Sequence, residues 1–393
     1  MSVALFNQPR THLPIGLDVG EAGLRLVQLQ DDGAGTSAGL SIHRSAVWTP
    51  DFAPERPPDA GARAAGPTGF AGGSTRCAGR PARYAGAIEE HASRFVAQSG
   101  FAGRSAITGL CVPAIEAHAL ELHRADNVTD PQELLKAATW EIRRLTALDK
   151  TELQTAIWPL PETQRSKATY MGIAAPRAQV QGRLDLCSAA RLACSKVDVA
   201  ACALANLIWR LRGRPPKQVW GILDLGCHLT RLTVCVDDTP VIMRSLEMGG
   251  RRWTEQIAAA LQVSETTAER NKREFGLAAG TENQAASGEL SALILGILRS
   301  DVQRMSLELE RSYEYVLQCY PTHTPGALIL VGGGARMNGL DQYLAGKLGI
   351  ESMPVSRCAS RETESLISGL RGHDSLEICA LACGLSLQGA AHA

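Results

Sequence analysis

The sequence predicts an α/β fold made of two related domains, because one strand–turn–strand segment occurs in both halves of the chain. Residues 15–29 and 221–236 each hold an apolar strand that ends at an aspartate, Asp18 or Asp224, and a second apolar strand after the turn. Asp and Gly are favoured turn residues, so each segment is typical of a β-hairpin. Since the two copies lie far apart, we expect each to mark its own domain.

A third apolar strand, at 327–331, is followed directly by Gly332, Gly333 and Gly334. Backbone N–H groups that converge in a tight glycine turn can hold phosphate oxygens. The two hairpin turns and this third turn therefore predict two clamps for phosphate and a shelf for a nucleoside. The glycine run lacks the spacing of a dinucleotide-binding fingerprint, which argues against that rival interpretation.

The turn aspartates add a metal to this interpretation. A carboxylate repels phosphate directly, but Asp18 and Asp224 can hold Mg²⁺ through water, because this ion keeps part of its hydration shell. Thr230, after the second turn, supplies a hydroxyl donor. A single Asp-x-Gly hairpin is usually an ordinary turn. Two matched copies favour a binding site.

The composition is that of a globular protein with several domains. Its 393 residues predict two or three domains, and 45% of them are hydrophobic. Lys+Arg and Asp+Glu both total 40, which argues against a nucleic-acid-binding protein, because phosphate affinity needs an excess of basic charge. The 11 cysteines include no Cys-x-x-Cys spacing, so we interpret them as core residues rather than metal ligands.

The sequence predicts a cytoplasmic protein whose contact with a membrane is indirect. Residues 1–14 lack the apolar core of a secretory signal. No run reaches the ~20 apolar residues that cross a bilayer. The most apolar stretches, 290–298 and 378–387, are too short.

The predicted organisation places a small unit between two parts of the first domain. The first domain begins with residues 1–113, which include a Pro-, Gly- and Arg-rich stretch at 50–83 with few apolar residues, typical of a disordered insertion. The small unit covers 114–196. Residues 197–217 return to the first domain, and 218–393 form the second.

Helix and strand signals are clearest in the small unit. A strand at 117–122, a helix with Asp130 at its N-cap, and strands at 153–158 and 167–174 give a β-α-β-β pattern, which a helix at 177–194 completes. In the second domain, apolar residues recur at helical intervals over 290–318 and predict one long helix.

These features resemble the actin-like ATPase superfamily, and within it the PilM family of type IV pilus assembly proteins. The resemblance rests on Gly16–Gly20, the small unit, the second hairpin, the Gly332 turn and the closing segment 381–387. It covers most of the chain outside 50–83. It implies an actin-like ATPase fold, with two related ribonuclease-H-like domains, nucleotide between them, and a small inserted subdomain of the 1C type.

The resemblance also implies a ligand, ATP with Mg²⁺, and a role for each candidate residue. Asp18 and Asp224 would contact Mg²⁺ through water, and no catalytic base is indicated. A solvated helix face is the alternative for Glu269 and Lys272. The implied ATP-binding residues are Asp18 and Gly20 in the first phosphate loop; Asp224, Gly226 and Thr230 in the second; Gly249, Gly250, Glu269 and Lys272 near the ribose and base; and Gly332, Gly333 and Gly334 as the adenosine shelf.

Both phosphate loops depart from the family pattern. Where small hydroxyl residues are usual, the first loop reads Glu21-Ala-Gly and the second Cys227-His-Leu. The first change removes hydroxyl donors and adds a negative charge beside the expected phosphate. These departures predict reduced affinity for ATP and weak or no hydrolysis.

The resemblance implies an adaptor of the type IV pilus platform at the inner membrane. Its partner would be a PilN-like bitopic protein, whose N-terminal cytoplasmic tail would bind in a groove between the first domain and the small unit; other platform proteins are further partners. One alternative is an active ATPase or sugar-kinase-like enzyme. Another is an FtsA-like cell-division protein, for which a C-terminal amphipathic membrane helix is expected but not found. A type II secretion subunit would continue into a membrane helix.

Overall fold

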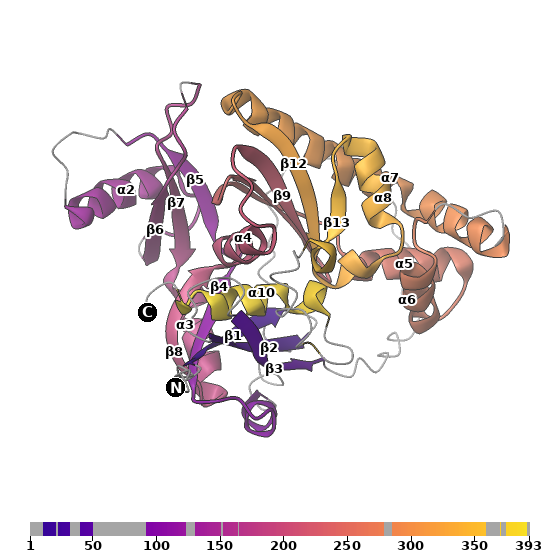
Figure 1. Ribbon diagram of the computed structural model, residues 1–393, viewed down its shortest axis with the longest axis horizontal. Helices are drawn as coiled ribbons and strands as arrows, with labels where there is room; N and C mark the ends of the chain where they lie inside the picture. Colours follow the sequence, from indigo (N-terminus) through magenta and orange to yellow (C-terminus); the bar gives the residue numbers. More distant parts are fainter. Residues whose placement is uncertain are drawn as a thin grey trace, which may run out of the picture.

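The computed structural model describes residues 11–20, 23–31, 40–49, 92–122, 130–150, 152–163, 165–278, 285–358, 370 and 375–390. The predicted insertion at 50–83 lies outside them. The described residues form three sheets with helices around and between them (Figure 1).

The first sheet has five strands in the order β3-β2-β1-β4-β8. The strands β1, β2 and β3 form an antiparallel meander, and β4 and β8 continue the sheet in parallel with β1. The first predicted hairpin is the pair β1 and β2. The strands are β1 (Thr11–Gly20), β2 (Gly23–Asp31), β3 (Leu40–Trp48), β4 (Ser105–Leu110) and β8 (Ala193–Val199).

The second sheet repeats this arrangement, with the order β11-β10-β9-β12-β13. Its first three strands are again an antiparallel meander, and the last two run parallel to β9. The second predicted hairpin, β9 and β10, therefore has the same place as β1 and β2. The strands are β9 (Gln218–Leu225), β10 (Thr230–Val236), β11 (Thr239–Leu246), β12 (Thr324–Val331) and β13 (Ser352–Pro354).

The third sheet is small and antiparallel, with the order β5-β7-β6. Helix α2 (Pro131–Leu145) packs on it, and the Asp130 side chain caps the helix by accepting a hydrogen bond from the Gln132 N–H at 2.9 Å. The predicted β-α-β-β pattern is present. The strands are β5 (Glu116–Leu120), β6 (Leu153–Pro159) and β7 (Tyr170–Pro176).

The helix predicted at 177–194 is too long. Helix α3 (Arg177–Ala189) ends where Arg191 adopts a left-handed φ of 58°. The chain then continues as β8, which pairs with β4 in the first sheet, although 193–196 were placed in the small unit. The domain boundaries remain a prediction.

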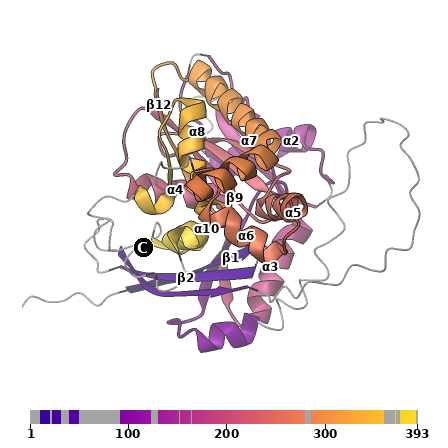
Figure 2. The same cartoon turned by 90° about the vertical axis from the view of Figure 1, so that its right-hand side faces the viewer.

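Two helices, α4 (Ala200–Leu211) and α10 (Leu376–Leu387), lie between the two large sheets (Figures 1 and 2). Their apolar side chains share one core with residues of both sheets, including Leu29 and Trp220. The Ser386 hydroxyl donates to the Pro14 carbonyl at 2.7 Å, so α10 is also held to the first sheet by a hydrogen bond.

The outer face of the second sheet is covered by four helices that share a second core with it. The predicted long helix is confirmed as α7. Among the described residues, no helix combines the length and the apolar character needed to span a bilayer. The four are α5 (Gly250–Leu261), α6 (Glu265–Glu274), α7 (Ala285–Cys319) and α8 (Leu340–Leu348).

Candidate functional site

The two Asp-x-Gly turns end hairpins of the same design. In the first, Gly20 pairs with Gly23, and Asp18 faces Arg25. In the second, the Gly226 N–H donates to the Leu229 carbonyl at 3.0 Å, so the two strands meet at the same spacing along the chain. Each hairpin therefore carries its aspartate at the same position relative to its turn.

Each aspartate is paired with an arginine of its own hairpin. Arg25 Nη1 lies 3.3 Å from Asp18 Oδ2, and Arg231 Nη1 lies 3.3 Å from Asp224 Oδ2. Arg231 faces Asp224 across β9 and β10, as Arg25 faces Asp18. The pattern Asp-x-Gly-x-x-x-x-Arg thus occurs twice, a repeated signal that the sequence analysis did not use.

The two guanidinium groups also lie over the glycines expected to hold phosphate. A Cβ atom added at Gly20 would lie 2.7 Å from Arg25 Nη1. One added at Gly226 would lie 3.5 Å from Arg231 Nη1. The space beside each glycine is therefore next to a cation of the protein itself.

The second pair joins the two halves of the molecule. Arg231 Nε donates to the carbonyl of Val112, just after β4 of the first sheet, at 2.9 Å. Burial raises the pKa of Asp224 above its ordinary value; Arg231 opposes the shift, and the nearby Asp18 carboxylate adds to it. Both hairpins therefore contribute to one electrostatic cluster.

Thr230 and the glycines before α5 support the second hairpin. The Thr230 hydroxyl is fully buried and donates to the Met248 carbonyl at 2.9 Å. The Gly250 N–H donates to the Gly226 carbonyl at 2.9 Å. A Cβ atom at Gly249 would lie 2.4 Å from the Cys227 carbonyl oxygen. Thr230 thus has a structural partner, and the start of α5 is bonded to the turn.

The Gly332 turn lies against the end of β9. Gly332 has a φ of +83°, which glycine adopts without strain, and a Cβ atom there would lie 2.7 Å from Asp224 Oδ1. One at Gly334 would lie 2.7 Å from Leu225 Cβ, whereas nothing lies within 4 Å of a Cβ at Gly333. The structure therefore brings the predicted shelf and the second clamp together.

Glu269 and Lys272, both on α6, connect that helix to α5. Lys272 is buried, and its ammonium group donates to the Gly250 carbonyl at 2.8 Å, to Thr254 Oγ1 at 2.7 Å and to Glu269. Burial alone would raise the pKa of Glu269, but Lys272 and hydrogen bonds outweigh it, so this pKa lies below its ordinary value of 4.5. The solvated-face alternative therefore does not hold for Lys272.

We expect Glu269→Gln to lower the free energy of unfolding by about 1 kcal/mol at pH 7, because it removes the charge that pairs with Lys272. A lowered folded-state pKa contributes stability that is fully present above the unfolded-state pKa and is lost as the pH falls through the folded-state pKa. Urea unfolding at pH 7, 5 and 3.5 should therefore show the difference between wild type and variant shrinking at the lowest pH. A difference independent of pH would contradict this origin.

A hollow of about 480 Å³ lies between α6 and the residues after the Gly332 turn. Three of its lining side chains are basic and two are acidic. Its position next to Glu269 is where the ribose and base were predicted. The lining residues are Thr266, Glu269, Arg270, Arg273, Glu274 and Arg336.

A protein-family comparison decides which family this is. The family model described as "Type IV pilus assembly protein PilM" matches residues 147–390, more than half of the chain. The chain belongs to the PilM family. The resemblance seen in the sequence is therefore confirmed.

Two solved structures are similar to this PilM-family chain. A chain of the "PilM-PilN type IV pilus biogenesis complex" is 22% identical with a TM-score of 0.65, and the match covers 96% of this chain and 98% of that one. The ethanolamine utilization protein EutJ from Carboxydothermus hydrogenoformans is 14% identical with a TM-score of 0.49, covering 97% and 91%. With the duplicated sheet order, the first likeness confirms the actin-like ATPase fold.

The donor set of this PilM-family chain does not fit Mg²⁺–ATP well. Asp18 and Asp224 both have arginine partners, and the Thr230 hydroxyl is bonded to a carbonyl. Among the described residues there is no cluster of three or more His, Cys, Asp or Glu side chains suited to a metal ion. An arginine thus lies beside the aspartate and the glycine of each hairpin that the sequence analysis predicted as a phosphate clamp.

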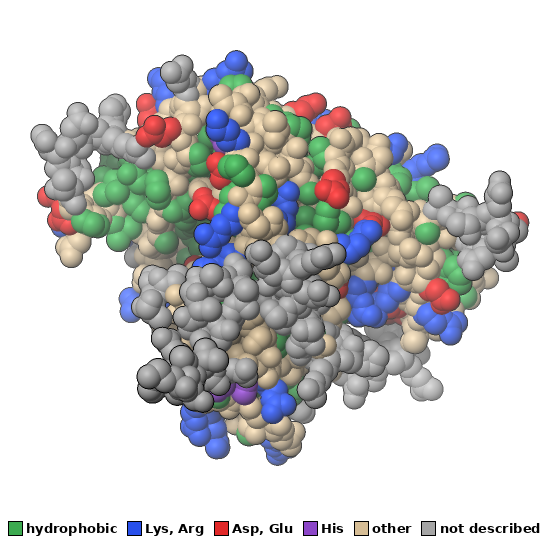
Figure 3. All heavy atoms as spheres, in the orientation of Figure 1, with side chains coloured by type: hydrophobic (Ala, Val, Ile, Leu, Met, Phe, Trp, Pro, Cys, Tyr) green, Lys and Arg blue, Asp and Glu red, His purple; other side chains and the backbone are tan. Residues whose placement is uncertain are grey.

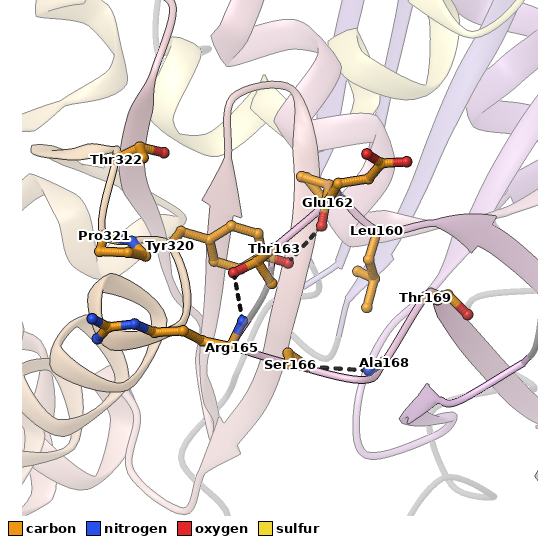
Figure 4. Close-up of a pocket in the computed structure, with 11 residues that line it drawn as sticks. Leu160, Glu162, Thr163, Arg165, Ser166, Ala168, Thr169, Tyr320, Pro321 and Thr322 are labelled. Atoms are coloured by element: carbon orange, nitrogen blue, oxygen red, sulfur yellow. Dashed lines mark hydrogen bonds between the residues drawn. The ribbon is translucent and has the colours of Figure 1, made fainter.

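A second hollow, of about 790 Å³, is lined by the loop between β6 and β7 and by residues at the end of α7 (Figure 4). At its edge the loop and the end of α7 are joined by two hydrogen bonds: the Tyr320 hydroxyl donates to the Pro161 carbonyl at 3.2 Å, and the Thr163 hydroxyl donates to the Cys319 carbonyl. Nearby, Trp158 Nε1 donates to the Pro240 carbonyl at 3.1 Å. The small sheet is therefore fastened to the second half of the chain.

Proposed function

We propose that this PilM-family chain is an adaptor of the type IV pilus assembly platform, at the cytoplasmic face of the inner membrane. In this role it binds the N-terminal cytoplasmic tail of a PilN-like bitopic protein and contacts other platform proteins. The family match over 147–390 carries the proposal. The likeness to a chain of a PilM–PilN complex over 96% of this chain supports the partner.

Weak ATP binding and weak or no hydrolysis belong to the same proposal. An adaptor acts by holding partners, so it does not need turnover. The pairing of Asp18 and Asp224 with arginines supports this part, because a carboxylate in an ion pair is a poorer ligand for hydrated Mg²⁺. The hollow beside α6 favours retained contact with a nucleoside. The alternative of an active ATPase lacks a base for the attacking water.

The small unit offers a surface for the partner's tail. Figure 3 shows hydrophobic side chains gathered over α2 and the small sheet. On α2, Leu135, Trp140 and Leu145 are exposed, and Trp140 is 67% exposed. A gathered patch of exposed hydrophobic side chains, as in Figure 3, is typical of a protein interaction site. The predicted groove between the first domain and the small unit would adjoin this surface.

We expect a synthetic peptide of the partner's cytoplasmic tail to bind the full chain, and Trp140→Ala to weaken binding about tenfold. Loss of one buried aromatic contact at an interface costs on the order of 1–2 kcal/mol. Titration calorimetry measures the affinity. Leu293→Ala is the control, because Leu293 is 51% exposed near the start of α7, whereas the small unit contacts the other end of that helix. No binding by wild type would contradict the adaptor role; binding unchanged by Trp140→Ala would contradict this surface alone.

A further inference from the structure

We infer that Arg25 and Arg231 are built-in counter-ions that take the place of a divalent cation between the two Asp-x-Gly hairpins. The inference does not depend on the pilus partner. It follows from the charge, the position and the anchoring of the two arginines.

The two Asp–Arg pairs are neutral without any bound ion. Asp18 and Asp224 carry two negative charges, and each has a guanidinium nitrogen at 3.3 Å from a carboxylate oxygen. Two unpaired carboxylates on facing hairpins would attract a divalent cation, which binds oxygen ligands through water or directly. Here each carboxylate is already neutralised by a cation that cannot dissociate or lose its proton.

The arginines also occupy the space that a cation and its phosphate would need. Arg25 Nη1 lies beside Gly20 and Arg231 Nη1 beside Gly226, the two glycines whose missing side chains leave room at the turns. The Arg25 and Arg231 side chains are only 15% and 26% exposed. They are therefore packed into the hairpins and do not extend freely into solvent.

Anchoring keeps the second arginine in this position. Arg231 uses Nη1 for Asp224 and Nε for the Val112 carbonyl, so its planar group is fixed from two directions. Val112 follows β4, a strand of the first sheet next to β1. The same arginine thus neutralises Asp224 of the second hairpin and holds that hairpin to the first half of the chain.

Binding of Mn²⁺, used as a paramagnetic substitute for Mg²⁺, tests the inference on the full chain without nucleotide. Electron paramagnetic resonance should detect no Mn²⁺ site in wild type that is lost on Asp224→Asn. Arg25→Ala/Arg231→Ala should gain one site with a dissociation constant tighter than about 1 mM, and adding Asp224→Asn should abolish it. Arg25→Lys/Arg231→Lys keeps both charges and should not gain the site.

Two results would overturn the inference: an Mn²⁺ site in wild type that Asp224→Asn removes, or a folded Arg25→Ala/Arg231→Ala protein without a new site. Circular dichroism shows whether the double variant is folded. If it is not, Arg25→Ala alone replaces it, because the bond of Arg231 to Val112 is then intact. If Arg25→Ala gains an Mn²⁺ site that Asp18→Asn then removes, the inference is supported. If Arg25→Ala gains no site, the inference is rejected.

Discussion

Gly384→Ala should lower the free energy of unfolding by about 1–2 kcal/mol, although the same change in an open helix is stabilising. Gly384 lies in α10 at its crossing with α4, and a Cβ atom there would lie 2.4 Å from the Ala203 carbonyl oxygen. That neighbour is backbone, so a helix must move to relieve the contact. Overpacking a core costs about 1–3 kcal/mol, occasionally more, against a gain of about 0.5–1 kcal/mol in helix propensity.

Gly296→Ala is the matched control, because Gly296 lies inside α7 with nothing within 4 Å of its added Cβ. This variant should be more stable than wild type by up to about 1 kcal/mol. Urea unfolding followed by circular dichroism measures both. The same Gly→Ala substitution is therefore expected to lower the free energy of unfolding in α10 and to raise it in α7. A stabilised Gly384→Ala protein would show that α4 and α10 are not in close contact.

Close packing against α10 also explains a glycine of the segment Gly16–Gly20, on which the family resemblance rests. Gly16 begins the segment that ends at Gly20, but a Cβ atom at Gly16 would lie 1.8 Å from the Ala382 carbonyl oxygen of α10. Its role is close packing. Local sequence does not reveal this packing role, because the contact joins residues from opposite ends of the chain.

The duplicated hairpins were predictable because their signal is local. The pairing of Gly20 with Gly23, three residues apart in the sequence, sets the register of both strands. Asp18 lies two residues before the turn pair and Arg25 two residues after it, so they must face each other. The Asp–Arg pairs could therefore have been predicted from the same signal. So could the poor fit of the two paired carboxylates to Mg²⁺.

Two strands of the large sheets were missed for different reasons. In β8, the segment Ala193–Val199 mixes Ala, Cys, Ser and Lys with few β-branched residues, so it lacks a clear strand signal. Strand β13 has only three residues, Ser352–Pro354. Both join the sheets in parallel with distant strands, and such pairing depends on tertiary packing.

Lys272→Met should lower the free energy of unfolding by about 2–4 kcal/mol, the largest effect we expect from a single side chain near the candidate site. Burial lowers the pKa of Lys272, and Glu269 opposes that shift, so the ammonium group depends on its partners. Methionine keeps the apolar stem but leaves the Gly250 carbonyl and Thr254 without this donor. A lost hydrogen bond to a charged group costs about 1.5–3 kcal/mol.

Arg273→Met separates this effect from the general loss of a positive charge on α6. Arg273 pairs with the same Glu269 carboxylate, but its side chain is 47% exposed, compared with 4% for Lys272. An exposed pair contributes less than about 1 kcal/mol. Urea unfolding gives both values, and hydrogen exchange should show faster opening of α5 and α6 in Lys272→Met alone. Equal losses in the two variants would mean that Lys272 acts only through its charge. A larger loss in Lys272→Met would instead identify it as the buried link that fixes α6 to the start of α5, beside the second hairpin.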